Sequence, residues 1–133
     1  MDRLIIEREP NTLKIVLDKD NKIFLFEGRS LPENTVKFFE PVMNWISSYK
    51  NEPADETIVS MNFVYFNTSS AKLLLQILRE FDSIHKAGNP VKIIWHYMVD
   101  DTDIQEAGEE YSTMVTMPFE YKEHPEADYE ALL

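Results

Sequence analysis

Large apolar residues occupy every second position from Leu13 to Leu17, as they do on the buried face of a β-strand. The polar residues 18–21 follow, and the apolar run 23–26 comes next. Two such segments on either side of a short polar stretch predict a β-hairpin with a turn of about four residues. The apolar residues 4–6 predict one further strand at the edge of the sheet.

Apolar side chains then recur at the spacing of a helix across residues 36–49. Ser30 and Glu33 have the spacing of a capping box, which marks the start of a helix. We therefore predict a helix over about residues 32–50. Pro41 lies inside it and lacks a backbone N–H, so we expect a kink or a break there.

A strand, a helix and a second strand follow in that order. Residues 57–66 are rich in β-branched and aromatic side chains, residues 71–86 have helical spacing, and residues 91–97 form another largely apolar strand. The polar residues 67–70 supply the helix cap, and Gly88 ends the helix. One face of the first strand is expected to be wholly apolar: Val59, Met61, Phe63 and Tyr65. This order predicts a right-handed parallel crossover.

The last third of the chain predicts one more helix and one more short strand. The acids from Asp100 to Asp103 are suited to the first turn of a helix, and residues 118–121 read as a strand. Residues 124–133 read as an acidic, mobile tail. The chain is thus expected to be a single α/β domain over residues 1–123. We expect a mixed β-sheet of about 5–6 strands with an N-terminal hairpin, the parallel crossover and about three helices.

Composition narrows the classes of function. The chain has 133 residues, 24 acidic and 13 basic, with a net charge of −11, no cysteine and three glycines. Such acidity argues against nucleic-acid or anionic-membrane partners, which need a basic surface. Too few glycines are present for a dinucleotide fingerprint or a P-loop. The start of the chain lacks the layout of a signal peptide, so we expect a cytoplasmic protein.

The negative charge is concentrated in the last quarter of the chain. Residues 1–99 hold 13 acids and 12 bases, whereas residues 100–133 hold 11 acids and one base, Lys122. The acidity therefore describes a local field around the third predicted helix and the tail. The nearly neutral first 99 residues remain suited to a protein interface.

No pattern in the sequence predicts a catalytic or metal site. The histidines at positions 85, 96 and 124 share no spacing typical of a metal site or a catalytic triad, and the acids at 100–103 lack the glycine and glutamate of an EF-hand. No Ser or Thr has a recognisable base beside it. We expect neither a cofactor, nor a metal, nor enzymatic activity.

The most informative segment is 65–72, where Asn67, Thr68, Ser69 and Ser70 stand between a parallel strand and a helix. One interpretation is purely structural: these residues shape the turn and cap the helix. The other is that one hydroxyl is a phosphate acceptor, because functional groups at the carboxyl edge of such a sheet are accessible on a rigid frame. The residues alone leave both open.

An apolar strand that runs into a hydroxyl cluster and then a leucine-rich helix resembles the STAS-like regulators, of which anti-sigma-factor antagonists are examples. Four segments are similar, more narrowly, to the SiaC family of bacterial regulatory phosphoproteins. They are Leu31-Pro32-Glu33-Asn34 with Phe38, Phe39 and Trp45, the block 65–72, Ile94-Trp95-His96-Tyr97, and residues 100–111.

This resemblance implies a STAS-like domain that acts as a non-enzymatic switch. In that family the threonine of the block, here Thr68, is phosphorylated by a dedicated Ser/Thr kinase and reset by a PP2C-like phosphatase. The unphosphorylated form binds and activates a diguanylate cyclase, which links the switch to cyclic-di-GMP signalling and biofilm formation. Asn67, Ser69, Ser70 and Lys72 would then form the loop and cap around the phosphosite.

Consecutive parallel strands end at the same edge of a sheet, so the Thr68 segment should face residues 99–101, and residues 28–30 if that strand is also parallel. Cations and carboxylates there would attract or repel a phosphate, and exposed aromatic side chains would suit an interface. The residues expected in these roles are Arg29, Lys72, Asp100, Asp101, Tyr65, Phe66 and Tyr97. Two alternatives remain: a STAS-type module that binds a small ligand or nucleotide at the same edge, and an enzyme with buried carboxylates.

Overall fold

Six strands form one sheet whose spatial order follows the sequence, from β1 to β6. The computed structural model describes residues 1–131. The strands are β1 (Leu4–Ile6), β2 (Lys14–Asp18), β3 (Ile23–Ser30), β4 (Thr57–Phe66), β5 (Val91–Met98) and β6 (Phe119–His124). The helices are α1 (Thr35–Tyr49), α2 (Thr68–Lys86), α3 (Thr102–Ser112) and a short 3-10 turn, η1 (Glu126–Tyr129).

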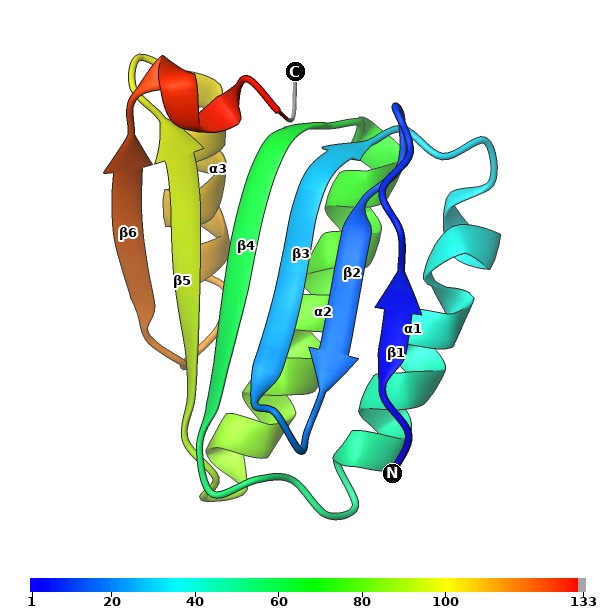
Figure 1. Cartoon of the computed structure of the whole chain (residues 1–133). Coiled ribbons are helices and arrows are strands. Elements are labelled where there is room, and N and C mark those ends of the chain that lie inside the picture. The colour runs from blue at the N-terminus through cyan, green and yellow to red at the C-terminus, as the bar shows by residue number, and fades with distance from the viewer. Residues whose placement is uncertain (132–133) are drawn as a thin grey trace.

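The sheet is mixed, as the sequence predicts. β1, β2 and β3 pair antiparallel, whereas β3, β4, β5 and β6 pair parallel to one another. The helices α1, α2 and α3 lie on one side of the sheet and connect these parallel strands in turn (Figure 1). The four parallel strands therefore all end at one edge, which we call the carboxyl edge.

One hydrophobic core lies between the sheet and the helices. Its largest members are fully buried aromatic side chains from both layers, including Phe39 of α1, Phe81 of α2 and Trp95 of β5. The Trp95 indole donates a hydrogen bond to the Ile104 carbonyl at 2.9 Å and so anchors α3 to the middle of the sheet. Burial of large side chains of this kind is worth about 1.5–3 kcal/mol each.

The helix α1 begins later than the capping box predicts. Ser30 is fully buried at the end of β3, where it is paired with β4, so it cannot cap a helix. The cap is Asn34, whose side-chain oxygen accepts a hydrogen bond from the Lys37 N–H at 3.0 Å. The expected break at Pro41 is also wrong, because α1 continues through this residue to Tyr49.

A β-bulge changes which side chains of β4 face the core. Gly28 lies opposite Phe63, but the next residue, Arg29, lies opposite Tyr65, so β4 carries one extra residue at this point. Tyr65 is consequently 47% exposed instead of continuing the buried face. Phe66 turns toward the core, with its ring 5.3 Å from that of Phe63.

The end of the chain is packed against the domain as far as it is described. β6 runs to His124, inside the predicted tail, and η1 follows it at the carboxyl edge (Figure 1). Tyr129 is only 2% exposed, and Arg8 donates a hydrogen bond to the Ala131 carbonyl at 2.8 Å. The predicted mobile tail is therefore an ordered segment up to residue 131, and residues 132–133 lie outside the described range.

Gly108 tests the packing of α3 on the sheet. A Cβ atom at this position would overlap the Trp95 indole. We expect Gly108→Ala to lower the free energy of unfolding by about 1–3 kcal/mol, the usual cost of overpacking. Urea denaturation measures the change, with Glu106→Ala on the exposed face of α3 as control. An unchanged midpoint for Gly108→Ala would contradict this packing.

Candidate functional site

The hydroxyl cluster forms the first turn of α2. Asn67 is the N-cap, and its side-chain oxygen accepts a hydrogen bond from the Ser70 N–H at 2.9 Å. The helix thus begins at Thr68, three residues before the predicted start at Ala71. The expected phosphosite loop is wrong in this respect, because Thr68, Ser69 and Ser70 are helical. They lie at the positive end of the helix dipole, which favours a negative group.

Ser70 ties this turn to the end of β3. Its side chain is fully buried, and its hydroxyl donates to the Ser30 carbonyl at 3.0 Å. The Ser30 hydroxyl then donates to the Ser70 hydroxyl at 2.8 Å. The backbone N–H of Asn67 also donates to the Ser30 carbonyl, at 3.1 Å. Because the Ser70 hydroxyl is buried and its hydrogen bonds are made within the protein, Ser70 has a structural role.

Ser69 ties the same turn to the start of α1. Its hydroxyl donates to the Asn67 side-chain oxygen at 3.2 Å and accepts from the Thr35 hydroxyl at 2.8 Å. Thr68 is exposed, as Ser69 is, but it differs from both serines because its hydroxyl makes no hydrogen bond to another residue within 1–131. Of the three neighbouring hydroxyls, that of Thr68 is therefore the one that combines exposure with the lack of such a bond in this part of the chain.

Thr68 stands at the rim of a groove of about 260 Å³ between α2 and α3, which we call the α2–α3 groove. Its lining residues are Phe66, Thr68, Ala71, Lys72, Leu75, Ala107, Glu110, Tyr111 and Met114. Most of this lining is apolar. Lys72 lies one helical turn beyond Thr68 on the same face of α2, so one cation and one carboxylate, Glu110, accompany the hydroxyl.

Tyr111 holds α3 beside the Thr68 turn. Its hydroxyl donates to the Ala71 carbonyl at 2.7 Å, and its ring stacks on that of Phe66 at 6.3 Å. Burial, together with the nearby charge of Glu110, raises the pKa of Tyr111 above its ordinary value, so the group stays a neutral donor. The sequence places Tyr111 on the apolar face of α3 but does not reveal this bond.

A second groove, of about 250 Å³, adjoins the first at the carboxyl edge. It is lined by Val64, Tyr65, Phe66, Asp101, Asp103, Ile104 and Ala107. Phe66 and Ala107 line both grooves, so the two form one continuous surface. Asp101 also caps α3 by accepting a hydrogen bond from the Ile104 N–H at 3.1 Å.

Three expected interface residues line neither groove. Arg29 is half-buried at the end of β3, Tyr97 is half-buried against the core, and Asp100 is exposed in a turn with a φ of 67°. The carboxylate beside Thr68 is Glu110 and not Asp100 or Asp101. The sequence could not show this, because the placement depends on how α3 packs against α2.

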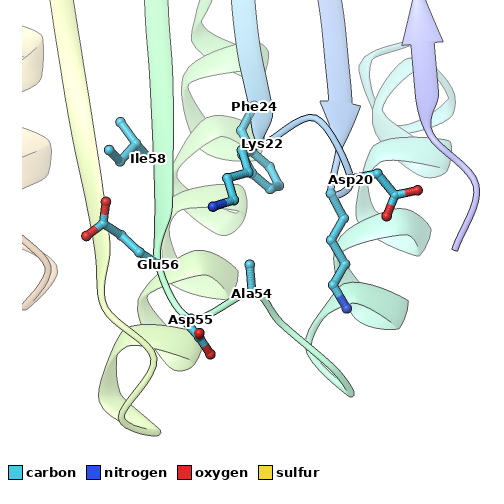
Figure 2. Close-up of a pocket in the computed structure, with 8 residues that line it drawn as sticks. Asp20, Lys22, Phe24, Ala54, Asp55, Glu56 and Ile58 are labelled. Carbon is cyan, nitrogen blue, oxygen red and sulfur yellow. The ribbon is translucent and has the colours of Figure 1, made fainter.

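The small-ligand alternative predicts a pocket at the carboxyl edge. The grooves there fall below the ~300–1,000 Å³ typical of small-molecule sites. A cavity of about 490 Å³ does exist, but at the opposite edge, between the β2–β3 turn and the start of β4 (Figure 2). Two lysines and three carboxylates line it, including Lys22 and Glu56. This mixture of charges favours neither an anionic nor a cationic ligand.

Two kinds of feature are absent from residues 1–131. None of the helices there is long and apolar enough to cross a membrane. That part of the chain also contains no group of three or more His, Cys, Asp or Glu side chains placed to hold a metal ion.

The two-layer α/β fold, a six-stranded mixed sheet with three helices on one side, is the STAS-like class of domain that the sequence predicts. The chain belongs to the SiaC family of regulatory phosphoproteins, whose family model matches residues 6–124. An uncharacterized protein of Pseudomonas aeruginosa strain UCBPP-PA14 is 30% identical over 100 residues, which cover 75% of this chain and 79% of that protein.

Solved structures agree with this family. SiaC of Pseudomonas aeruginosa matches with a TM-score of 0.85 and 28% identity, over 93% of this chain and 100% of that one. A second match is the crystal structure of the diguanylate cyclase SiaD in complex with its activator SiaC, from the same species. Its TM-score is 0.84 at 28% identity, over 91% of this chain and 99% of the matched chain.

The two serines provide a matched test of the α2 anchor. We expect Ser70→Ala to lower the free energy of unfolding by about 1–2 kcal/mol, because it leaves the buried Ser30 hydroxyl without its partner, while the Ser30 carbonyl keeps its bond from the Asn67 N–H. Ser69→Ala removes bonds that are exposed to solvent and should change it by less than about 0.5 kcal/mol. Chemical denaturation of both variants measures the difference, and equal effects would contradict the anchoring role of Ser70.

Proposed function

We propose that this protein is a non-enzymatic, cytoplasmic signalling switch that is reversibly phosphorylated on Thr68. A Ser/Thr kinase adds the phosphate and a PP2C-like phosphatase removes it. In its unphosphorylated form the protein binds and activates a diguanylate cyclase, and so controls cyclic-di-GMP signalling and biofilm formation. Family membership and the SiaC–SiaD complex support the partner class.

The observation that carries the proposal is the different bonding of three adjacent hydroxyls. Ser70 is buried and bonded to Ser30, and Ser69 is bonded to Thr35. Only Thr68 combines exposure with a position at the rim of the α2–α3 groove. A kinase can therefore reach the Thr68 hydroxyl without disturbing the contacts that hold the fold.

The charges near Thr68 allow a phosphate but do not neutralise it. A phosphate adds about −1.5 to −2 charges, and the N-terminus of α2 stabilises a negative group by about 0.3–1 kcal/mol. Lys72 supplies one positive charge, which the carboxylate of Glu110 in the same groove opposes. The phosphorylated protein should keep its fold while carrying an uncompensated negative charge at the groove.

The negative charge of the phosphate would act on binding if a partner inserts a side chain into the α2–α3 groove. One buried apolar side chain contributes about 1.5–3 kcal/mol to association. Removing an ionised group from water without a full partner costs several kcal/mol. The cost of desolvating the phosphate is thus at least as large as the free energy gained by burying one apolar side chain. A phosphate on Thr68 is therefore expected to prevent a partner from binding in the groove.

Phosphate mapping tests the acceptor. After incubation with the kinase from the same organism, intact mass should rise by one phosphate, and fragmentation should place it on Thr68. Thr68→Val should abolish the modification, whereas Ser69→Ala should retain it because its acceptor is unchanged. Phosphate on a peptide that lacks Thr68 would refute the assignment.

Binding of charge variants tests the mechanism. We expect Thr68→Glu to weaken binding to the diguanylate cyclase from the same organism at least tenfold, or about 1.4 kcal/mol, because the carboxylate must be desolvated at the groove. Gln76→Glu adds the same charge to an exposed position of α2 outside the groove and should change affinity little. Isothermal titration calorimetry compares them; equal weakening would indicate a general charge effect.

A further inference from the structure

Two histidines that are 28 positions apart in the sequence form a direct hydrogen bond on the face of the sheet away from the helices. His96 Nδ1 lies 2.7 Å from His124 Nε2, and the two rings stack with their centroids 5.0 Å apart. The parallel register of β5 and β6 creates this contact, because His96 lies opposite Lys122 and Met98 lies opposite His124. The spacing of these histidines in the sequence gives no sign of this contact.

The pair is extended at both ends by further hydrogen bonds. His96 Nε2 lies 2.9 Å from the Ser60 hydroxyl of β4. At the other end, His124 Nδ1 lies 3.2 Å from a carboxylate oxygen of Asp128 in η1. The chain of bonds therefore connects the middle of the sheet to the segment that follows β6.

That segment, residues 125–131, is docked at three points, and we call it the C-terminal latch. Asp128 bonds His124, Tyr129 is 2% exposed with its ring 6.0 Å from the His124 ring, and the Ala131 carbonyl accepts from Arg8. Figure 1 shows η1 lying across the carboxyl ends of β5 and β6. The histidine pair is thus part of the surface on which the latch rests.

The chain of hydrogen bonds through the two histidines can accept one added proton without losing a bond. With both rings neutral, Ser60 donates to His96, His96 donates to His124, and His124 donates to Asp128, so every bond has one hydrogen. With one added proton, His124 donates from both nitrogens and His96 donates to Ser60, and again every bond is made. A second proton places two N–H groups of charged rings against each other at 2.7 Å.

The surrounding charges oppose that second proton at His96. Burial comes first, followed by the charges of His124 and Lys122, and together they lower the pKa of His96 from 6.5 to about 4. The carboxylate of Asp128 faces His124, while Glu27 of β3 and Asp101 at the start of α3 lie near Tyr129. Burial and these carboxylates raise the pKa of Tyr129, which therefore stays neutral.

We propose that the C-terminal latch is proton-sensitive: it docks while the His96–His124 pair holds at most one proton, and a second proton releases it. The device uses none of the residues of the Thr68 site and goes beyond the proposed phosphorylation switch. Release would uncover the carboxyl ends of β5 and β6 and expose the Tyr129 side chain.

The direction of the pH dependence follows from linkage. Burial, followed by the charges of His124 and Lys122, lowers the pKa of His96 from 6.5 to about 4, and undocking of the latch would expose the pair to water and so reverse part of this shift. Docking therefore favours the neutral ring, so its full strength is present above pH 6.5 and is lost as the pH falls toward 4. Within this window the docking equilibrium constant should fall by up to about tenfold per pH unit.

Nuclear magnetic resonance of the full chain tests the proposal between pH 8 and pH 5. Long-range ¹H–¹⁵N spectra report the protonation of each imidazole nitrogen, and the Tyr129 ring and Ala127 methyl shifts report the docked population. The Tyr129→Ala variant serves as the undocked reference, because it lacks the buried side chain that holds the latch against the domain. We expect the pKa of His96 to be higher in this variant than in the parent protein, where burial and the charges of His124 and Lys122 lower it to about 4.

His96→Gln removes the site of the second proton and should make latch docking independent of pH in this range. His85→Gln, on a different element, should leave the pH dependence of docking unchanged. If both rings of the parent protein titrate near pH 6.5 while the Tyr129 shifts stay constant, the latch is not proton-sensitive. The same conclusion follows if His96→Gln keeps the pH response of the parent protein.

Discussion

The buried contact between Ser30 and Ser70 determines where the first turn of α2, and with it the proposed functional surface, lies. Parallel β3 and β4 end side by side, and the last residue of β3 accepts hydrogen bonds from both Asn67 and Ser70. These bonds fix the start of α2 at the sheet edge with the Ser70 side chain buried. The side chain of the first helical residue, Thr68, therefore points to solvent. The exposure of Thr68 is thus a consequence of the burial of its neighbour two residues on.

In the proposed switch, this edge of the sheet allows a phosphate on Thr68 to weaken binding without a change of fold. The structural bonds of the first turn belong to Asn67, Ser69 and Ser70, and a phosphate on Thr68 would leave them intact. The α2–α3 groove beside it is mostly apolar and has a single lysine to answer a phosphate. The free energy gained by burying a partner's apolar side chain in the groove is therefore opposed by the cost of desolvating a phosphate at its rim.

Local patterns predicted the strands, the three helices and the parallel crossover, because alternation and helical spacing are properties of short segments. They misplaced the start of α1, since Ser30 and Asn34 are both good caps and only the pairing of β3 with β4 decides between them. The bulge that exposes Tyr65 is likewise set by the neighbouring strand. Each of these errors lies where tertiary contacts override a local preference.

The candidate site was predictable in part. The cluster of hydroxyls predicted the turn at which the candidate site lies, but its chemistry alone does not distinguish Thr68 from Ser69 or Ser70, which differ in burial and hydrogen bonding only in the folded chain. Glu110 and Tyr111 reach the site from α3, some 40 residues further along the chain, as the bond between Tyr111 and Ala71 shows. The contact between His96 and His124 has the same origin, in the register of β5 and β6.

The proposed switch requires that a phosphate on Thr68 block a partner at the groove and leave the fold unchanged. The most direct test is to measure the dissociation constant of stoichiometrically phosphorylated protein for the diguanylate cyclase and to compare it with that of the unphosphorylated protein. We predict that phosphorylation raises the dissociation constant at least tenfold, while the far-ultraviolet circular dichroism spectrum stays the same. Equal dissociation constants, or a loss of folded structure on phosphorylation, would contradict it.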